Sequence, residues 1–132
     1  MATIRKFEEL DVWKLSREIV NAVYDLSNND VFSKDFALRD QICRSAISML
    51  SNIAEGVESG TDKQFARYLK IAKGSAGECR AQLYIALDQQ YISQIECKNL
   101  KKKLMRCSKK LSRLISYLNG NKVNELEIVY EP

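Results

Sequence analysis

The sequence predicts an all-α protein, folded as an antiparallel up-down-up-down four-helix bundle with a short C-terminal arm. Three observations lead to this fold class. One proline and five glycines in 132 residues are too few for a turn-rich β-sandwich. Apolar residues recur at steps of three and four along four segments, which is the spacing of a helix with one buried face. The connections between the segments are short, which favours antiparallel neighbours. We therefore expect one bundle domain at residues 1–120 and a tail at 121–132.

The first two helices have recognisable starts and ends. The first is predicted from Asp11, as its N-cap, to Ser27, where a run of Asn and Asp interrupts the pattern. The second is predicted from Asp35 to Glu58, and Gly60 supplies the turn that ends it.

The third and fourth helices each open with a capping box, in which the first and last residues cap one another. The third opens with Thr61-Asp62-Lys63-Gln64 and continues to about Gln90. The fourth opens with Ser93-Gln94-Ile95-Glu96 and stops at Asn119-Gly120, where the glycine permits a left-handed turn. In the tail beyond, Leu126, Ile128 and Tyr130 alternate with other residues, so a short extended arm and a frayed end both fit.

The composition argues against most kinds of catalytic site. Histidine, the commonest general base and metal ligand, is absent. There is no Walker loop, dinucleotide glycine pattern or zinc pair. Glu55 and Glu78 resemble half of a di-iron site, but such bundles use Glu-x-x-His. We expect no catalytic residue, no metal and no cofactor. The four cysteines lie in helical patterns and are expected to be small core residues, with disulfides or metal ligation as the alternative: Cys43, Cys79, Cys97 and Cys107.

Nothing in the sequence predicts a membrane protein. No apolar run approaches the length of a membrane span, and the first ten residues are rich in charge rather than apolar like a signal peptide. We therefore expect a cytoplasmic protein without a membrane partner.

Two of the predicted helices carry a second stripe beside the apolar one. It is made of small residues, isolated charges and a few isoleucines, and a helix with one buried face does not need it. On the second helix the stripe consists of Arg44, Ser48, Ser51 and Glu55. On the third helix it consists of Arg67, Ile71, Gly74, Glu78, Ala81 and Ile85.

We interpret the second stripe as a subunit interface of a homo-oligomer. Gly74 and Gly77 each destabilise a helix interior by about 1 kcal/mol relative to alanine, and close packing is the usual compensation. Arg44 is expected to pair with Glu78, or Glu55 with Arg67, within or between chains. The alternative is a mixed outer face with two tolerated glycines and ordinary exposed isoleucines.

Three segments resemble the bacterial four-helix-bundle proteins named for intervening sequences in 23S ribosomal RNA genes. They are F-E-E-L-D-V-W-K-L-S-R-E-I-V (Phe7 to Val20), Q-I-C-R-S-A-I-S-M-L-S-N-I-A-E-G (Gln41 to Gly56) and F-A-R-Y-L-K-I-A-K-G-S-A-G-E (Phe65 to Glu78). The segments S-N-I-A-E-G and I-A-x-G-S are the most specific. The chain departs from the family at Leu50, where proline is usual, and at Cys43, where a second arginine is common.

The resemblance implies an antiparallel bundle that assembles into a ring-like homo-oligomer, a pentamer in comparable members, with no established enzymatic activity. Related bundle proteins are accessory factors of reverse transcriptases in diversity-generating retroelements. There a basic pentameric barrel engages nucleic acid and the polymerase, which suggests a reverse transcriptase as a partner by analogy.

The predicted fourth helix carries most of the positive charge. Residues 98–113 sum to +8 without an acidic residue, whereas the remaining chain sums to −4. One outward row about 22 Å long is formed by Lys98, Lys102, Arg106, Lys109 and Arg113. Such a row suits the phosphates of RNA or DNA, bound without reading sequence. A solvated lysine-rich face is the alternative. Aromatic residues do not interrupt the row, so single-strand base stacking has little support on this helix. Tyr68, Tyr84 and Tyr91, on or beside the third helix, are expected to be packing residues.

The sequence thus predicts a non-catalytic, homo-oligomeric bundle that contacts RNA or DNA through its basic fourth helix. The competing hypothesis is a protein-interaction scaffold, or an accessory factor of a reverse transcriptase, with no direct nucleic-acid role.

Overall fold

A computed structural model describes residues 6–120, and within that range the chain is all α, with four long helices and no strand. The helices are α1 (Asp11–Ser27), α2 (Phe36–Glu58), α3 (Asp62–Asp88) and α4 (Gln94–Leu118). Single 3-10 turns, η1 (Phe7–Glu9) and η2 (Phe32–Lys34), precede α1 and α2. The predicted fold class is confirmed. The expected tail, with Leu126, Ile128 and Tyr130, lies outside the described residues.

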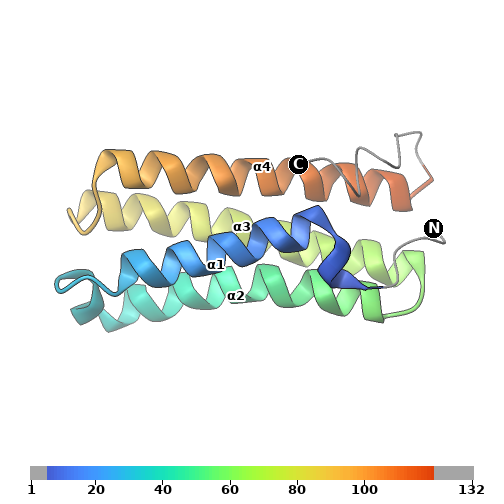
Figure 1. Cartoon of the computed structure of the whole chain (residues 1–132), viewed down its shortest axis with the longest axis horizontal. Helices are drawn as coiled ribbons and strands as arrows, with labels where there is room; N and C mark the ends of the chain where they lie inside the picture. Colours follow the sequence, from blue (N-terminus) through green and yellow to red (C-terminus); the bar gives the residue numbers. More distant parts are fainter. Residues whose placement is uncertain (1–5, 121–132) are drawn as a thin grey trace.

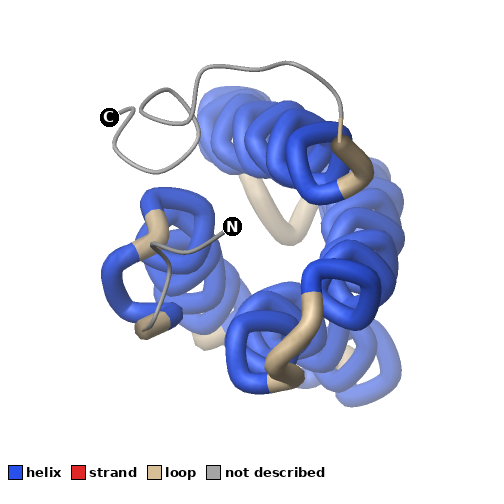
Figure 2. Tube along the Cα trace, turned by 90° about the vertical axis from the view of Figure 1, so that its right-hand side faces the viewer, coloured by secondary structure: helices blue, strands red, loops and turns tan. Residues whose placement is uncertain are grey.

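The four helices lie side by side, and successive helices run in opposite directions (Figure 1). Each helix packs on the next, and α4 returns to pack on α1, so the order around the bundle axis is α1, α2, α3, α4. Figure 2 shows this arrangement from one end. The pair α2 and α3 has the most extensive contact. Among residues 6–120 no helix is both long and apolar enough to cross a membrane.

The core consists of the predicted apolar stripes. Leucines of α3 and α4, such as Leu69, Leu83 and Leu104, share one core with Ile42 and Ile53 of α2, and all are almost completely buried. The four cysteines are buried and free, as predicted. Burial raises the pKa of Cys79 and of Cys107 from 9.0 to about 12. The helix α2 runs without a break through Leu50, where the family usually has proline.

Most helix ends form where local signals in the sequence predict them. Asp35 Oδ1 caps α2 by accepting from the Leu38 amide, and Ser93 forms the full capping box with Glu96. At Thr61 only half of the predicted box is present: its hydroxyl accepts from the Gln64 amide at 3.2 Å. The turns end in left-handed glycines, with φ of +89° at Gly60 and +88° at Gly120.

The helix α1 begins at Asp11, as predicted, but one predicted cap and one predicted helix end were wrong. The N-cap of α1 is Leu10, not Asp11, because η1 tucks Leu10 completely into the core in an extended conformation. The helix α3 ends at Asp88, two residues before the predicted end at Gln90. Gln90 has a left-handed φ of 63°, and the Tyr91 amide bonds back to the Ala86 carbonyl at 2.9 Å.

A polar network holds the α1–α2 and α3–α4 connections together at one end of the bundle. The Asn29 side-chain amide donates to the Tyr91 carbonyl at 2.9 Å, and the Tyr91 hydroxyl donates to Asp35 Oδ2 at 2.9 Å. The Tyr91 ring stacks on Phe32 with centroids 5.2 Å apart. The hydrogen bond to Asp35, with partial burial and the charge of that carboxylate, raises the pKa of Tyr91. This network fixes where α3 ends and α4 begins.

Candidate nucleic-acid interface

Charge divides the bundle into two unequal halves. Residues 62–118, which form the α3–α4 half, contain thirteen lysines and arginines but four aspartates and glutamates, a formal charge of +9. Residues 6–58, which form the α1–α2 half, contain six against ten, a formal charge of −4. Because α3 and α4 are neighbours in the bundle (Figure 1), the positive charge is concentrated on one side of the molecule.

The α4 basic row, Lys98, Lys102, Arg106, Lys109 and Arg113, lies largely where the sequence predicts. The first four side chains are exposed. Arg113 is half-buried and interacts with other residues of the chain, so it is less available than predicted. The available part therefore spans residues 98–109, about 16 Å at 1.5 Å per residue.

The helix α3 also contributes to this surface, which was not predicted from the sequence. Arg80 comes from α3 and joins Arg106 and Lys109 around one hollow, which we call the Arg80 pocket. Its remaining lining residues are Met105, Ser108 and Ser112, so it contains three cations and no acidic side chain. The sequence did contain an indication that α3 carries a polar flank: Lys73, Arg80 and Tyr84 lie on one side of α3, at steps of seven and four. The sequence could not tell that this flank faces α4.

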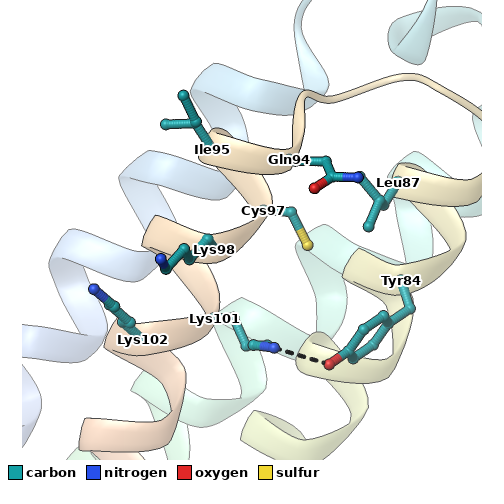
Figure 3. Close-up of a pocket in the computed structure, with 8 residues that line it drawn as sticks. All are labelled: Tyr84, Leu87, Gln94, Ile95, Cys97, Lys98, Lys101 and Lys102. Atoms are coloured by element: carbon teal, nitrogen blue, oxygen red, sulfur yellow. Dashed lines mark hydrogen bonds between the residues drawn. The ribbon is translucent and has the colours of Figure 1, made fainter.

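Tyr84 is also part of the surface, which corrects its predicted role as a packing residue. Its side chain is 46% exposed, because it lies at the edge of the contact between α3 and α4 rather than between the helices. We call this line of contact the α3–α4 seam. The Tyr84 hydroxyl accepts a hydrogen bond from Lys101 Nζ at 3.1 Å (Figure 3). Of the other two tyrosines, Tyr68 is half-buried and Tyr91 packs on Phe32, as predicted.

A second hollow surrounds Tyr84, and we call it the Tyr84 pocket. It is open to solvent and has a volume of about 580 Å³. Tyr84 and Leu87 line it from α3, and α4 supplies the rest: Gln94, Ile95, Cys97, Lys98, Lys101 and Lys102. Figure 3 shows Tyr84 and Lys101 meeting across the seam, whereas Lys98 and Lys102 extend from the other side of α4. The Tyr84 pocket thus links the seam to the α4 basic row.

The predicted subunit interface lies on a different surface, formed by α2 and α3, which we call the α2–α3 outer face. Its members are Arg44, Ser48, Ser51, Glu55, Arg67, Ile71, Gly74, Glu78, Ala81 and Ile85, and all but Ser48 are exposed. Ser48 lies at the contact between α2 and α3, which we call the α2–α3 seam. Its hydroxyl shares a 2.8 Å hydrogen bond with the hydroxyl of Ser75 on α3. Because α2 and α3 run in opposite directions, this bond sets their register. Arg44 therefore lies level with Glu78, and Glu55 lies level with Arg67.

The four charged residues of this face are not paired within the described part of the chain. Arg44, Glu55, Arg67 and Glu78 form no ion pair there, although each has an oppositely charged residue at its own level. Within residues 6–120, therefore, neither predicted pair forms an ion pair inside one chain. The version between chains stays a prediction.

Packing within the chain requires a glycine on α2 but not on α3. A Cβ atom on Gly56 would lie 2.8 Å from Phe65 Cδ1 and 3.2 Å from Tyr68 Cβ, so α3 approaches α2 closely at that point. A Cβ atom on Gly74 or Gly77 would meet nothing within 4 Å. Close packing within the chain accounts for Gly56 but not for Gly74 and Gly77.

Within residues 6–120 no group of three or more His, Cys, Asp and Glu side chains could hold a metal ion. Glu55 and Glu78, the two carboxylates considered from the sequence, lie at different levels of the bundle, about 16 Å apart along the helix axis.

Comparisons with known proteins agree with the fold and with the segments that carry the resemblance. Residues 8–113 match the 23S rRNA-intervening sequence protein family. A crystal structure from Bacteroides thetaiotaomicron, of a protein with unknown function from the S23 ribosomal protein family, is 25% identical to this chain. It superposes with a TM-score of 0.72 and covers 79% of this chain and 97% of its own. Among curated proteins no significant match is found. The chain belongs to the 23S rRNA-intervening sequence protein family.

Proposed function

We propose that this protein is a non-catalytic, homo-oligomeric bundle that binds RNA or DNA backbones through the α4 basic row. The observation that carries the proposal is the run from Lys98 to Lys109 on α4. Its four outward cations are exposed, and residues 98–113 contain no acidic residue. Phosphates repeated along a nucleic-acid backbone match such a row, and contacts to phosphate carry no sequence information.

The charge of the surrounding half supports a polyanionic ligand. The α3–α4 half has a formal charge of +9, and the Arg80 pocket adds a cation from α3 beside the row. A surface of one sign attracts the opposite charge over a Debye length and raises the rate of association. A merely soluble surface would not need its charges to be separated between the two halves of the bundle.

We also propose that the chain self-associates through the α2–α3 outer face. Exposed charges of both signs lie there at matching levels, and the glycine at position 74 is not required by packing within the chain. A second copy could satisfy both features. On the family resemblance we propose five subunits. A ring would repeat the basic row in every subunit, and this multivalency would strengthen binding to a long nucleic acid.

Fluorescence anisotropy with labelled RNA and DNA oligonucleotides of unrelated sequence tests the proposed binding. Affinity should be similar across sequences and should fall steeply between about 50 and about 200 mM salt. The double variant Arg106→Gln/Lys109→Gln should weaken binding and lower the salt slope by about 0.7–0.9 for each phosphate that the protein no longer neutralises. The matched control is Lys14→Gln/Lys34→Gln, which removes two exposed cations from the α1–α2 half.

The outcomes separate the hypotheses. Absence of RNA and DNA binding by the wild-type protein at low salt would overturn the proposal. Equal weakening by both double variants would show that only net charge matters and not the α4 basic row.

A second candidate function is that of a protein-interaction scaffold, including an accessory role beside a reverse transcriptase. It is favoured by large apolar side chains at the end of the bundle that carries the α1–α2 and α3–α4 connections. Phe36 is 73% exposed, Ile95 72% and Val31 62%. A protein that bound no nucleic acid at low salt, but bound a purified polymerase only while Phe36 and Ile95 were intact, would favour this function.

A further inference from the structure

We infer that the nucleic acid bound by this surface is single-stranded, and that Tyr84 stacks on one of its bases in the α3–α4 seam. The inference rests on the proposed function, because it names the kind of nucleic acid that the basic surface takes. A base within a duplex is stacked on its neighbours and paired. An aromatic side chain on a protein surface can therefore stack only on an unpaired base.

The position of Lys101 leaves the Tyr84 ring accessible. Lys101 Nζ lies 3.1 Å from the Tyr84 hydroxyl oxygen but 5.4 Å from the ring centroid. The ammonium is therefore beyond the hydroxyl and near the ring edge, not above the ring centre. The hydrogen bond holds the ring at the edge of the seam, and the side chain remains 46% exposed. An aromatic ring that is fixed and half exposed loses little side-chain entropy when a base stacks on it.

The surroundings of Tyr84 suit a base with its phosphates. Leu87 and Ile95 supply apolar surface in the Tyr84 pocket, and Gln94 offers a side-chain amide to base edges. Lys98, Lys101 and Lys102 supply positive charge, and none of the eight lining residues is acidic. Apolar and aromatic groups beside cations are the combination that single-strand binding proteins use.

The Arg80 pocket continues the same path along α4. Lys101 lies in the Tyr84 pocket and Lys109 in the Arg80 pocket, about 12 Å apart at the helical rise. Arg80, Arg106 and Lys109 surround the Arg80 pocket together with the hydroxyls of Ser108 and Ser112, all of which can donate hydrogen bonds to phosphate. A strand placed along the seam would therefore meet a stacking surface and then a phosphate site.

The experiment compares single-stranded and duplex DNA of one sequence, at one salt concentration, by fluorescence anisotropy. The wild type should bind the single strand more tightly. Tyr84→Leu should weaken single-strand binding about 5-fold or more, since one stacked base contributes about 1–3 kcal/mol. It should leave duplex binding within about 2-fold. Tyr84→Phe keeps the ring and loses only the bond to Lys101, so it should retain most of the affinity.

The matched control is Tyr24→Leu, which removes a tyrosine of similar exposure from α1, in the acidic half. It should change neither affinity. Photo-crosslinking to a strand carrying 5-iodouracil gives a second readout, and the crosslinked peptide should contain Tyr84. Thermal unfolding of each variant checks that the fold is intact.

The result that overturns the inference differs from the one that overturns the proposed function. If Tyr84→Leu binds both forms as tightly as the wild type does, or weakens both equally, while the α4 basic row still gives salt-dependent binding, the stacking inference fails and the proposed function stands. If the wild-type protein binds neither form at low salt, both fail.

Discussion

The helix α3 has two flanks, and they differ in almost every property. On the flank toward α2 the packing is close and polar groups are paired: a Cβ on Gly56 would collide with Phe65, and Ser48 bonds to Ser75. The outer face beside it carries charges of both signs. On the flank toward α4 the seam is hollowed at its surface, and the hollows are lined by cations and a half-exposed tyrosine.

The difference indicates two kinds of contact on one helix. Charges of both signs at matching levels can be satisfied by neighbouring copies, because in a ring the α2 side of this face in one copy can meet the α3 side in the next. Charges of one sign cannot, because like charges repel when two copies meet. The α2–α3 outer face is therefore suited to self-association, and the α3–α4 face to a polyanion.

Alkaline pH should have the largest effect on the free energy of unfolding. It tests whether the α2–α3 and α3–α4 seams belong to one cooperative core. Burial raises the pKa of Cys79 and Cys107 to about 12, so above pH 9 the unfolded thiols ionise while the folded ones stay protonated. The folded state then binds more protons, and the free energy of unfolding falls as pH rises, by about 1.4 kcal/mol per pH unit for each thiol. Below that window both states are protonated and the contribution is constant.

Urea unfolding at several values between about pH 8 and pH 11 measures this effect. The variant Cys79→Ala/Cys107→Ala should lose the corresponding part of the slope. A difference in stability between wild type and variant that did not change with pH would contradict the prediction. If Cys79→Ala or Cys107→Ala alone unfolded in urea in two separate transitions, the two seams would not form one cooperative core.

The substitution Gly56→Ala should have the next largest effect on stability, because it adds a methyl group where α2 and α3 pack closely. The added Cβ would lie 2.8 Å from a ring carbon of the buried Phe65, so the free energy of unfolding should fall by about 1–3 kcal/mol. The control Gly77→Ala lies on the α4 side of α3 and meets nothing within 4 Å. It should increase stability by up to about 1 kcal/mol through helix propensity. Equal effects in urea unfolding would remove the contrast between the two seams.

Charge reversal at Arg44 and Glu78 tests the proposed use of the α2–α3 outer face. Arg44→Glu or Glu78→Arg alone should weaken assembly by about 1 kcal/mol per interface through like-charge repulsion, and the double variant should restore it. Sedimentation velocity or light scattering after gel filtration measures the assembly. Lys103→Glu is the control, because Lys103 pairs with Glu18 across α1 and α4 at 4.0 Å, away from this face. Single variants that assemble like the wild type would contradict the prediction.

The smallest expected effect is that of Gly74→Ala, and its two readouts should have opposite signs. The monomer should gain about 0.5–1 kcal/mol, since the new Cβ meets nothing in its own chain. Assembly should weaken, because a methyl group would separate two surfaces that approach closely at the glycine. Gly77→Ala provides the matched control, with the same gain in stability and unchanged assembly. Unchanged assembly in both variants would show that Gly74 is a tolerated outer glycine.

The features that could be predicted from the sequence are those decided by neighbouring residues. The caps at Asp35, Thr61 and Ser93 depend on bonds to amides three residues away, and the turn at Gly60 depends on its own φ. The N-cap of α1 and the end of α3 could not be predicted in this way. Leu10 caps α1 because it is buried in the core, and Gln90 adopts a left-handed φ where Tyr91 is held by Phe32 and Asp35.

In the candidate site too, some features followed from the local sequence and others only from the packing of the helices. The outward position of Lys98, Lys102, Arg106 and Lys109 followed from the helical period, because the leucines opposite them had to be buried. The exposure of Tyr84 and the place of Arg80 did not follow. A helical wheel gives the angle of a side chain around its own helix but not where the neighbouring helix lies.

Periodicity and capping are local properties of the chain, and they were enough to specify the fold class, the four helices, the core stripes and the basic row. Packing of the helices determined which flank of α3 meets which neighbour. It brought Arg80 and Tyr84 beside the row, and it left Gly74 open while closing Gly56 against Phe65. These outcomes depend on helix register and on the distance between helices, which are set only when all four apolar stripes pack into one core.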